Sequence, residues 1–165
     1  MRNRIIKEKK TTVYELVRNA KLYPLAKYLD YSDLALSRKN KNLKTLASGL
    51  SDDDPVIRYW SVVGLLLLEK QAKPAIPNLK KILNDKDEIP ALAAWAIFKA
   101  GSENFAIKWM LDEIQENPEN KMLANVLDWM DKASFSILAQ IPNDKLPKRG
   151  LIKDVVNRYK IRVLN

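Results

Sequence analysis

Three consecutive carboxylates, Asp52, Asp53 and Asp54, form the densest group of residues in the sequence that could bind a cation. Ca²⁺ is bound by oxygen ligands of this kind, so the group could indicate a calcium site. It stands directly before Pro55, however, and Pro favours the first helical position, where an Asp side chain accepts the free N–H groups. We therefore expect Asp53 or Asp54 to cap a helix and not to ligate a metal.

Arg58 and Tyr59 follow within the first turns of the same predicted helix and could form a patch that binds a ligand. A guanidinium presents a planar fork of donors that suits a carboxylate. We therefore expect Arg58 to pair with a carboxylate such as Asp85. With Trp60, these residues and the capping aspartates are the candidate structural or interaction residues of the chain.

The sequence has four tryptophans: Trp60, Trp95, Trp109 and Trp129. Exposed tryptophan rings can serve as platforms on which bases or sugars stack. Each of the four lies within an apolar stretch with helical spacing. We therefore expect all four to pack in the core or between neighbouring helices.

Catalytic chemistry has few candidate residues, because the chain contains no histidine and no cysteine. These are the most common general base, metal ligand and thiol nucleophile. Glu113 and Glu116 are three residues apart on a predicted helix and could act as an acid and base pair. No glycine-rich loop or metal cluster lies near them in sequence, so we expect surface charge. The sequence predicts no catalytic, cofactor-binding or metal-binding site.

The net charge of +9 is unevenly distributed along the chain. Residues 1–50 hold 12 Lys and Arg against 4 Asp and Glu, residues 51–140 hold 10 against 14, and residues 141–165 hold 7 against 2. The excess of +8 and +5 at the two ends flanks a central part of −4. A nucleic-acid groove along the central helices needs the reverse, so we expect a protein partner and no specific nucleic acid. No apolar run approaches the roughly 20 residues that span a bilayer, so we expect no membrane partner.

The residues discussed first belong to one stretch, Asp52–Leu68, that is apolar nearly all round and must be buried on several sides. A shift of 32 residues places Asp53–Leu68 on Asp85–Ala100, with small and aliphatic residues recurring at matching positions. A looser third copy covers Met122–Trp129. A period of two helices predicts an all-α fold of the α-α superhelix type, a HEAT-like or armadillo-type solenoid of antiparallel helix pairs.

The other segments fit the same plan, and no strand pattern appears. Thr11 or Thr12 can cap a helix that runs to about Lys21, and Pro24 opens another. The candidate core residues of this second helix are Leu25, Leu29, Leu34 and Leu36. Further helices are expected at Leu43–Leu50, Ala75–Leu83, Asn104–Asn117 and Leu151–Leu164. We expect residues 1–165 to form one domain, with 1–12 as a frayed or linker segment.

The string Asp54-Pro55-Val56-Ile57-Arg58, followed by small residues and leucines, resembles the short HEAT-like repeats. In the second copy Pro90 takes the place of Arg58, which interrupts any Asp–Arg ladder between repeats.

A narrower resemblance covers about residues 13–141, with RYWSVVGL at 58–65 as its most specific part. This order of helices resembles the helical appendage C-terminal to the catalytic domain in some bacterial sulfatases. The nucleophile motif of that family, a Cys or Ser followed at fixed spacing by Pro and Arg, is missing from this chain. The resemblance implies the non-catalytic part of a sulfatase-type hydrolase, or an accessory to one.

Three classes of function follow from these observations. The first is a non-catalytic HEAT-like interaction or scaffolding module, the second a HEAT-like nucleic-acid-binding protein or DNA glycosylase-like enzyme, and the third a stand-alone structural protein. The second predicts Lys and Arg at the same place in each repeat, and they do not recur. We expect the first, with no enzymatic activity of the chain alone. Its location is then periplasmic or secreted if it belongs to an exported sulfatase, and cytoplasmic otherwise.

Overall fold

The computed structural model describes Lys10, residues 12–19, 23–85, 89–141, Pro147 and residues 150–163. These residues form helices and connections, with no strand in the described ranges, which confirms the all-α prediction. The helices are α2 (Val13–Arg18), α3 (Leu25–Leu36), α4 (Leu43–Gly49), α5 (Pro55–Leu68), α6 (Ile76–Ile82), α7 (Ile89–Lys99), α8 (Glu103–Glu116), α9 (Lys121–Met130), α10 (Lys132–Leu138) and α11 (Leu151–Val163), with 3₁₀ segments η1 (Asn40–Asn42) and η2 (Glu69–Ala75).

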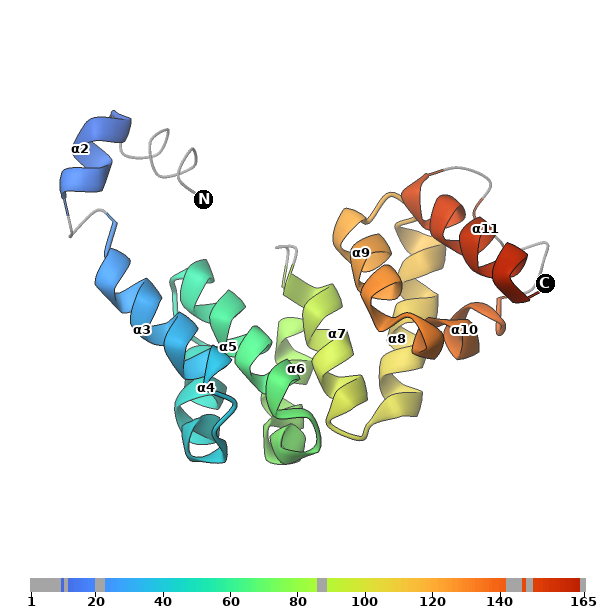
Figure 1. The fold of residues 1–165 in the computed structure, drawn as a ribbon, viewed down its shortest axis with the longest axis horizontal. Coiled ribbons are helices and arrows are strands. Elements are labelled where there is room, and N and C mark those ends of the chain that lie inside the picture. The colour runs from blue at the N-terminus through green and yellow to red at the C-terminus, as the bar shows by residue number, and fades with distance from the viewer. Residues whose placement is uncertain are drawn as a thin grey trace.

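From α3 to α11, each odd-numbered helix packs on the next odd-numbered helix. Helix α3 contacts α5, α5 contacts α7, α7 contacts α9, and α9 contacts α11. The intervening helices α4, α6 and α10 pack on α5, α7 and α9, and α8 packs on α7 and α10. Figure 1 shows these helices following one another across the molecule in chain order, with α2 standing apart near the N-terminus.

The helices α3, α5, α7 and α9 share a way of ending. Each is followed by a residue with positive φ, at Arg38, Glu69, Gly101 and Asp131, which are 31, 32 and 30 residues apart. A left-handed residue stops an α-helix and redirects the chain. The 32-residue period of the sequence therefore has a counterpart in the backbone, although only one of the four positions is a glycine.

Helix α5 lies in the centre of the core, as its composition predicts. Ile57, Val62 and Leu65 are fully buried, and the core cluster extends from α3 to α11. Gly64 sits where α5 meets α3 and α4, because a Cβ built on it would lie 2.7 Å and 2.8 Å from the methyl groups of Leu46 and 3.0 Å from Cα of Ala35. Only a residue without a side chain allows the helices this close.

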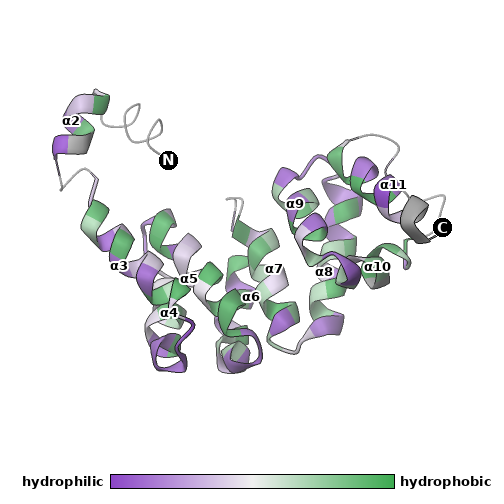
Figure 2. Ribbon diagram, viewed as in Figure 1, coloured by the Kyte–Doolittle hydropathy of each residue, from purple (hydrophilic) through white to green (hydrophobic). Residues whose placement is uncertain are grey.

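The predicted core residues of α3 are wrong for three of the four leucines. Leu25, Leu29 and Leu36 are 52%, 55% and 58% exposed, while the buried residues of this helix are Tyr28 and Ala35. The reason is that α3 approaches α5 through the small Ala35, which fits against Gly64, and so turns its leucines elsewhere. Figure 2 shows apolar residues in green along α3 as well as along the buried helices.

The predicted end of the first helix also differs from the structure. Helix α2 is capped by Thr12, whose side chain accepts from the N–H of Glu15 while the Glu15 carboxylate accepts from the N–H of Thr12. It ends at Arg18, with Asn19 as its C-cap, so the expected extension to Lys21 is wrong over the described residues. The expected linker lies mostly outside the described residues.

In the part of the chain that the structure describes, no helix has the length and apolar character needed to cross a bilayer.

Candidate functional site

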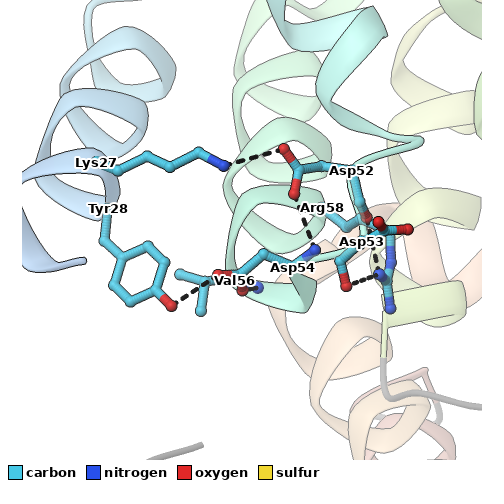
Figure 3. Close-up of polar contacts among 7 residues, drawn as sticks. All are labelled: Lys27, Tyr28, Asp52, Asp53, Asp54, Val56 and Arg58. Atoms are coloured by element: carbon cyan, nitrogen blue, oxygen red, sulfur yellow. Dashed lines mark hydrogen bonds and ion pairs between the residues drawn. The ribbon is translucent and has the colours of Figure 1, made fainter. Parts of the chain in front are cut away.

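The aspartates before α5 are held by donors from two helices (Figure 3). Asp54 is the N-cap of α5, and its Oδ1 accepts a hydrogen bond from the N–H of Val56 at 2.9 Å. Its Oδ2 accepts from the hydroxyl of Tyr28 on α3 at 2.7 Å. One carboxylate therefore starts α5 and ties it to α3.

Asp52 makes a second link between the same helices. Its Oδ2 lies 3.2 Å from Nζ of Lys27 on α3, and its Oδ1 accepts from the N–H of Asp54 at 2.8 Å. Partial burial acts to raise the pKa of Asp52, but the hydrogen bonds from Asp54 and Lys27 and the charges of Lys27 and Arg58 outweigh it. The pKa of Asp52 therefore lies below its ordinary value.

Arg58 extends the cluster towards α7. Its side chain is only 19% exposed, and its Nη1 donates to the backbone carbonyl oxygens of Asp52 and Asp53 at 2.9 Å and 3.1 Å. Its Nε lies 3.5 Å from Oδ2 of Asp85, at the end of the chain segment after α6. The structure therefore confirms the expected pair of Arg58 and Asp85.

The remaining candidate residues have different surroundings. The Asp53 residue is exposed, and it takes part through its backbone carbonyl; the cap is Asp54. Tyr59 is exposed and meets the ring of Trp60 edge-on, with centroids 5.5 Å apart. Trp60 is half-buried and packs against both apolar clusters of the core. The two aromatic residues thus form a packing contact beside the polar cluster.

This polar cluster joins three parts of the molecule, namely α3, α5 and the segment that leads to α7. Its carboxylates accept from N–H, O–H and ammonium donors of the protein itself, so they act as caps and ties. Sequence reasoning missed the contributions of Lys27 and Tyr28, because nothing local to α3 indicates which residues meet the loop before α5. Within the described ranges, no group of three or more Asp or Glu side chains could hold a metal ion.

The other tryptophans pack in the two ways predicted. Trp95 and Trp109 are half-buried and pack on the core. Trp129 is mostly exposed and lies outside the core, but its ring lies 6.3 Å from that of Trp95, so it packs between the neighbouring helices α7 and α9.

A groove of about 390 Å³ lies between α9 and α11. Arg158 on α11 donates to Asp128 on α9 at 2.8 Å, and the hydroxyl of Tyr159 donates to the carbonyl oxygen of Asp128 at 3.2 Å. These bonds cross the groove and hold the two helices together. Its polar residues therefore have a role in packing the last helix.

The most distinctive surface is the α3 leucine stripe, which we define as Leu25, Leu29 and Leu36. At about 100° per residue, the three positions fall within about 40° of one another around the helix. Five of the nine large apolar residues that the described part of the chain exposes lie on α2 and α3. The stripe runs into the basic loop, which we define as Arg38, Lys39, Lys41 and Lys44, all exposed.

Comparison of the chain with protein-family models, with curated proteins and with solved structures gives no match.

Proposed function

We propose that the chain is a non-catalytic HEAT-like α-solenoid that binds another protein through its first helix pair, α3 and α4. The observation that carries this proposal is the α3 leucine stripe. Three leucines on one side of a well-packed helix are an uncommon feature of a surface that meets only water. They lie where a further repeat would stack on the array, at the side of α3 that no later helix covers.

The solenoid part of the proposal is supported by the alternate contacts of the helices. The series α3, α5, α7, α9 and α11, with one other helix between successive members, is the arrangement of stacked two-helix repeats. The left-handed residues at intervals of 31, 32 and 30 support the same reading of the repeat. An array of this kind contacts partners through its ends and faces and needs no catalytic residues.

The non-catalytic part rests on residue chemistry. Of the three consecutive carboxylates before α5, those of Asp52 and Asp54 are engaged in capping α5 and joining it to α3. With no histidine or cysteine, the chain lacks the most common general base and the thiol nucleophile. The resemblance of residues 58–65 makes a sulfatase-type catalytic domain the first partner to test.

A display library of helical peptides tests the docking surface. Purified chain is the bait, and the counter-selection bait carries Leu25→Glu, Leu29→Glu and Leu36→Glu. We expect enriched peptides that bind the natural chain and lose binding to this variant, while Leu151→Glu, at an exposed leucine of α11, leaves binding unchanged. Peptides that bind all three baits equally would show that the stripe is not the docking surface.

A salt titration of binding to a random DNA duplex tests the nucleic-acid alternative. The exposed cations of the basic loop span one short segment, so they can meet few phosphates at once. We expect weak binding and a shallow dependence on salt. A steep slope, equivalent to about six or more neutralised phosphates, would reject the protein-binding proposal.

A further inference from the structure

We infer that the segment bound along α3 is an acidic amphipathic helix of another protein. This inference rests on the proposed function and names the chemistry of its partner. It follows from the shape of the α3 leucine stripe, from the hydrogen bonds of the polar groups beside it, and from the charges of the basic loop.

The stripe matches one helix in length and width. Helix α3 has 12 residues and is therefore about 18 Å long. Leu25, Leu29 and Leu36 project along it at intervals of four and seven residues, the spacing with which a helix presents apolar anchors to a partner helix. A single amphipathic helix can cover a stripe this narrow, whereas a flat protein surface would leave much of it uncovered.

The two serine hydroxyls next to the stripe do not oppose burial. Ser32 lies between Leu29 and Leu36 on the same side of α3, and its hydroxyl donates to the carbonyl oxygen of Leu29 at 2.8 Å. Ser37, after the end of the helix, donates in the same way to the carbonyl oxygen of Leu34 at 2.8 Å. Because both hydroxyl protons are already bonded, a partner can exclude water here without leaving either donor unpaired.

The charges at one end of the stripe point to an acidic partner. Within the described residues, none of the four cations of the basic loop lies within ion-pair distance of a carboxylate, whereas Lys27 on α3 pairs with Asp52. The loop follows directly on Leu36, so a helix on the stripe passes close to it. Carboxylates on that helix would be attracted and steered by these cations, which no carboxylate of the described residues neutralises.

Of the two acidic residues on α3, Asp33 borders the stripe and Asp30 lies farther round the helix. Both are exposed, and they lie about 60° and about 120° from the middle of the stripe. They flank it on one side and leave the basic loop beyond Leu36 unopposed. An acidic helix therefore meets attraction at the loop and a like charge only at its Asp33 edge.

A second copy of this chain fits the surface less well. Residues 25–44 hold five Lys and Arg against two Asp, an excess of +3, so each copy brings the same sign of charge to a contact between two α3 helices. In a two-fold pairing Leu36 meets Leu25 of the partner copy, and the basic loop then faces the chain around Pro24, which offers it no carboxylate. The cations would remain without partners on both sides.

The experiment uses two designed helical peptides with identical leucines, one with Glu and Asp on the flanking positions and one with Lys and Arg. Fluorescence anisotropy measures the binding of each to the full chain at low and at high salt. We expect the acidic peptide to bind at least about tenfold more tightly than the basic one, and to lose affinity as salt rises.

Three variants sharpen this result, and circular dichroism checks that each is folded. Leu29→Glu should abolish binding of the acidic peptide, and the combination of Lys39→Glu with Lys41→Glu should move the preference towards the basic peptide. Leu151→Glu is the matched control and should bind as the natural chain does.

The failures are distinguishable. Equal, Leu29-dependent binding of both peptides would overturn the inference and leave the proposed function standing. Sedimentation could instead show that the chain self-associates and that Leu29→Glu abolishes this. That result would also overturn the inference, because a second copy of the chain would then occupy the stripe. Binding of neither peptide by a monomeric chain would reject both.

Discussion

Helices α3 and α5 lie side by side and are both rich in leucine, yet they expose their leucines to very different extents. In α5, Leu65 and Leu68 are buried among α3, α4 and α7. In α3, three leucines face away from the core, and the contact with α5 is made through Tyr28 and Ala35. The comparison teaches that small residues at a close crossing, and not the number of leucines, decide which side of an end helix is buried.

The largest expected effect belongs to the buried side of this comparison. Leu65→Ala removes a fully buried side chain from the middle of α5 and should lower the free energy of unfolding by about 2–5 kcal/mol. Leu29→Ala, the matched change on α3, should lower it by no more than about 0.5 kcal/mol. Urea unfolding of the two variants measures the difference, and equal losses would show that α3 buries its leucines.

Gly64→Ala tests the crossing itself. The new methyl group would lie 2.7 Å from a methyl group of Leu46, which can turn away, and 3.0 Å from the backbone Cα of Ala35, so we expect a loss of about 1–3 kcal/mol as α3 is pushed from α5. Gly101→Ala is the control, because its Cβ meets nothing within 4 Å and its cost of about 1–2 kcal/mol comes from the positive φ alone. Asn at each position separates the steric cost from the backbone cost. Because Asn tolerates positive φ, Gly101→Asn should lose less stability than Gly101→Ala, whereas Gly64→Asn should lose at least as much as Gly64→Ala.

The polar tie between α3 and α5 should contribute less. Asp54→Ala removes the cap of α5 and the acceptor of the Tyr28 hydroxyl, and should cost about 1–2 kcal/mol in thermal or urea unfolding. Asp53→Ala, one residue earlier with an exposed side chain, should stay within about 0.5 kcal/mol of the natural chain. Equal effects would contradict the assignment of Asp54 as the cap.

The smallest effect concerns pH. Because the pKa of Asp52 is lowered in the folded chain, its carboxylate stabilises the fold above the unfolded pKa of about 3.9, and this contribution is lost as pH falls through the lower folded value. The difference in unfolding free energy between the natural chain and Asp52→Asn should therefore shrink below about pH 4. Urea titrations at several pH values measure it, and a difference that grows in acid would contradict the tie to Lys27.

Residues close together in the sequence made some of the helices and one ion pair predictable. The proline at position 55 with an aspartate before it predicts the start of α5, and the 32-residue shift predicts a helix within Asp85–Ala100, where α7 lies. The ion pair of Arg58 with Asp85 was also predicted, because the pairing follows from the repeat and from the geometry of a guanidinium.

The rest depends on contacts between segments far apart in the chain. Nothing near Lys27 or Tyr28 indicates that they meet the loop before α5. The left-handed residues Arg38, Glu69 and Asp131 carry no local signal either, because glycine and asparagine are the residues typical of such positions. The side of α3 that packs was mispredicted because leucine spacing alone cannot tell a buried stripe from an exposed one.

We propose that the α3 leucine stripe binds a partner and contributes nothing to the core. This proposal is tested most directly by the free energy of unfolding with and without the acidic peptide, for the natural chain and for Leu29→Glu combined with Leu36→Glu. At a peptide concentration of about 100 times Kd the natural chain should gain about 2.7 kcal/mol. The variant should unfold as the natural chain does without peptide and should gain nothing from it. A variant that is already less stable by about 2 kcal/mol, or one that gains as much from the peptide, would contradict the account.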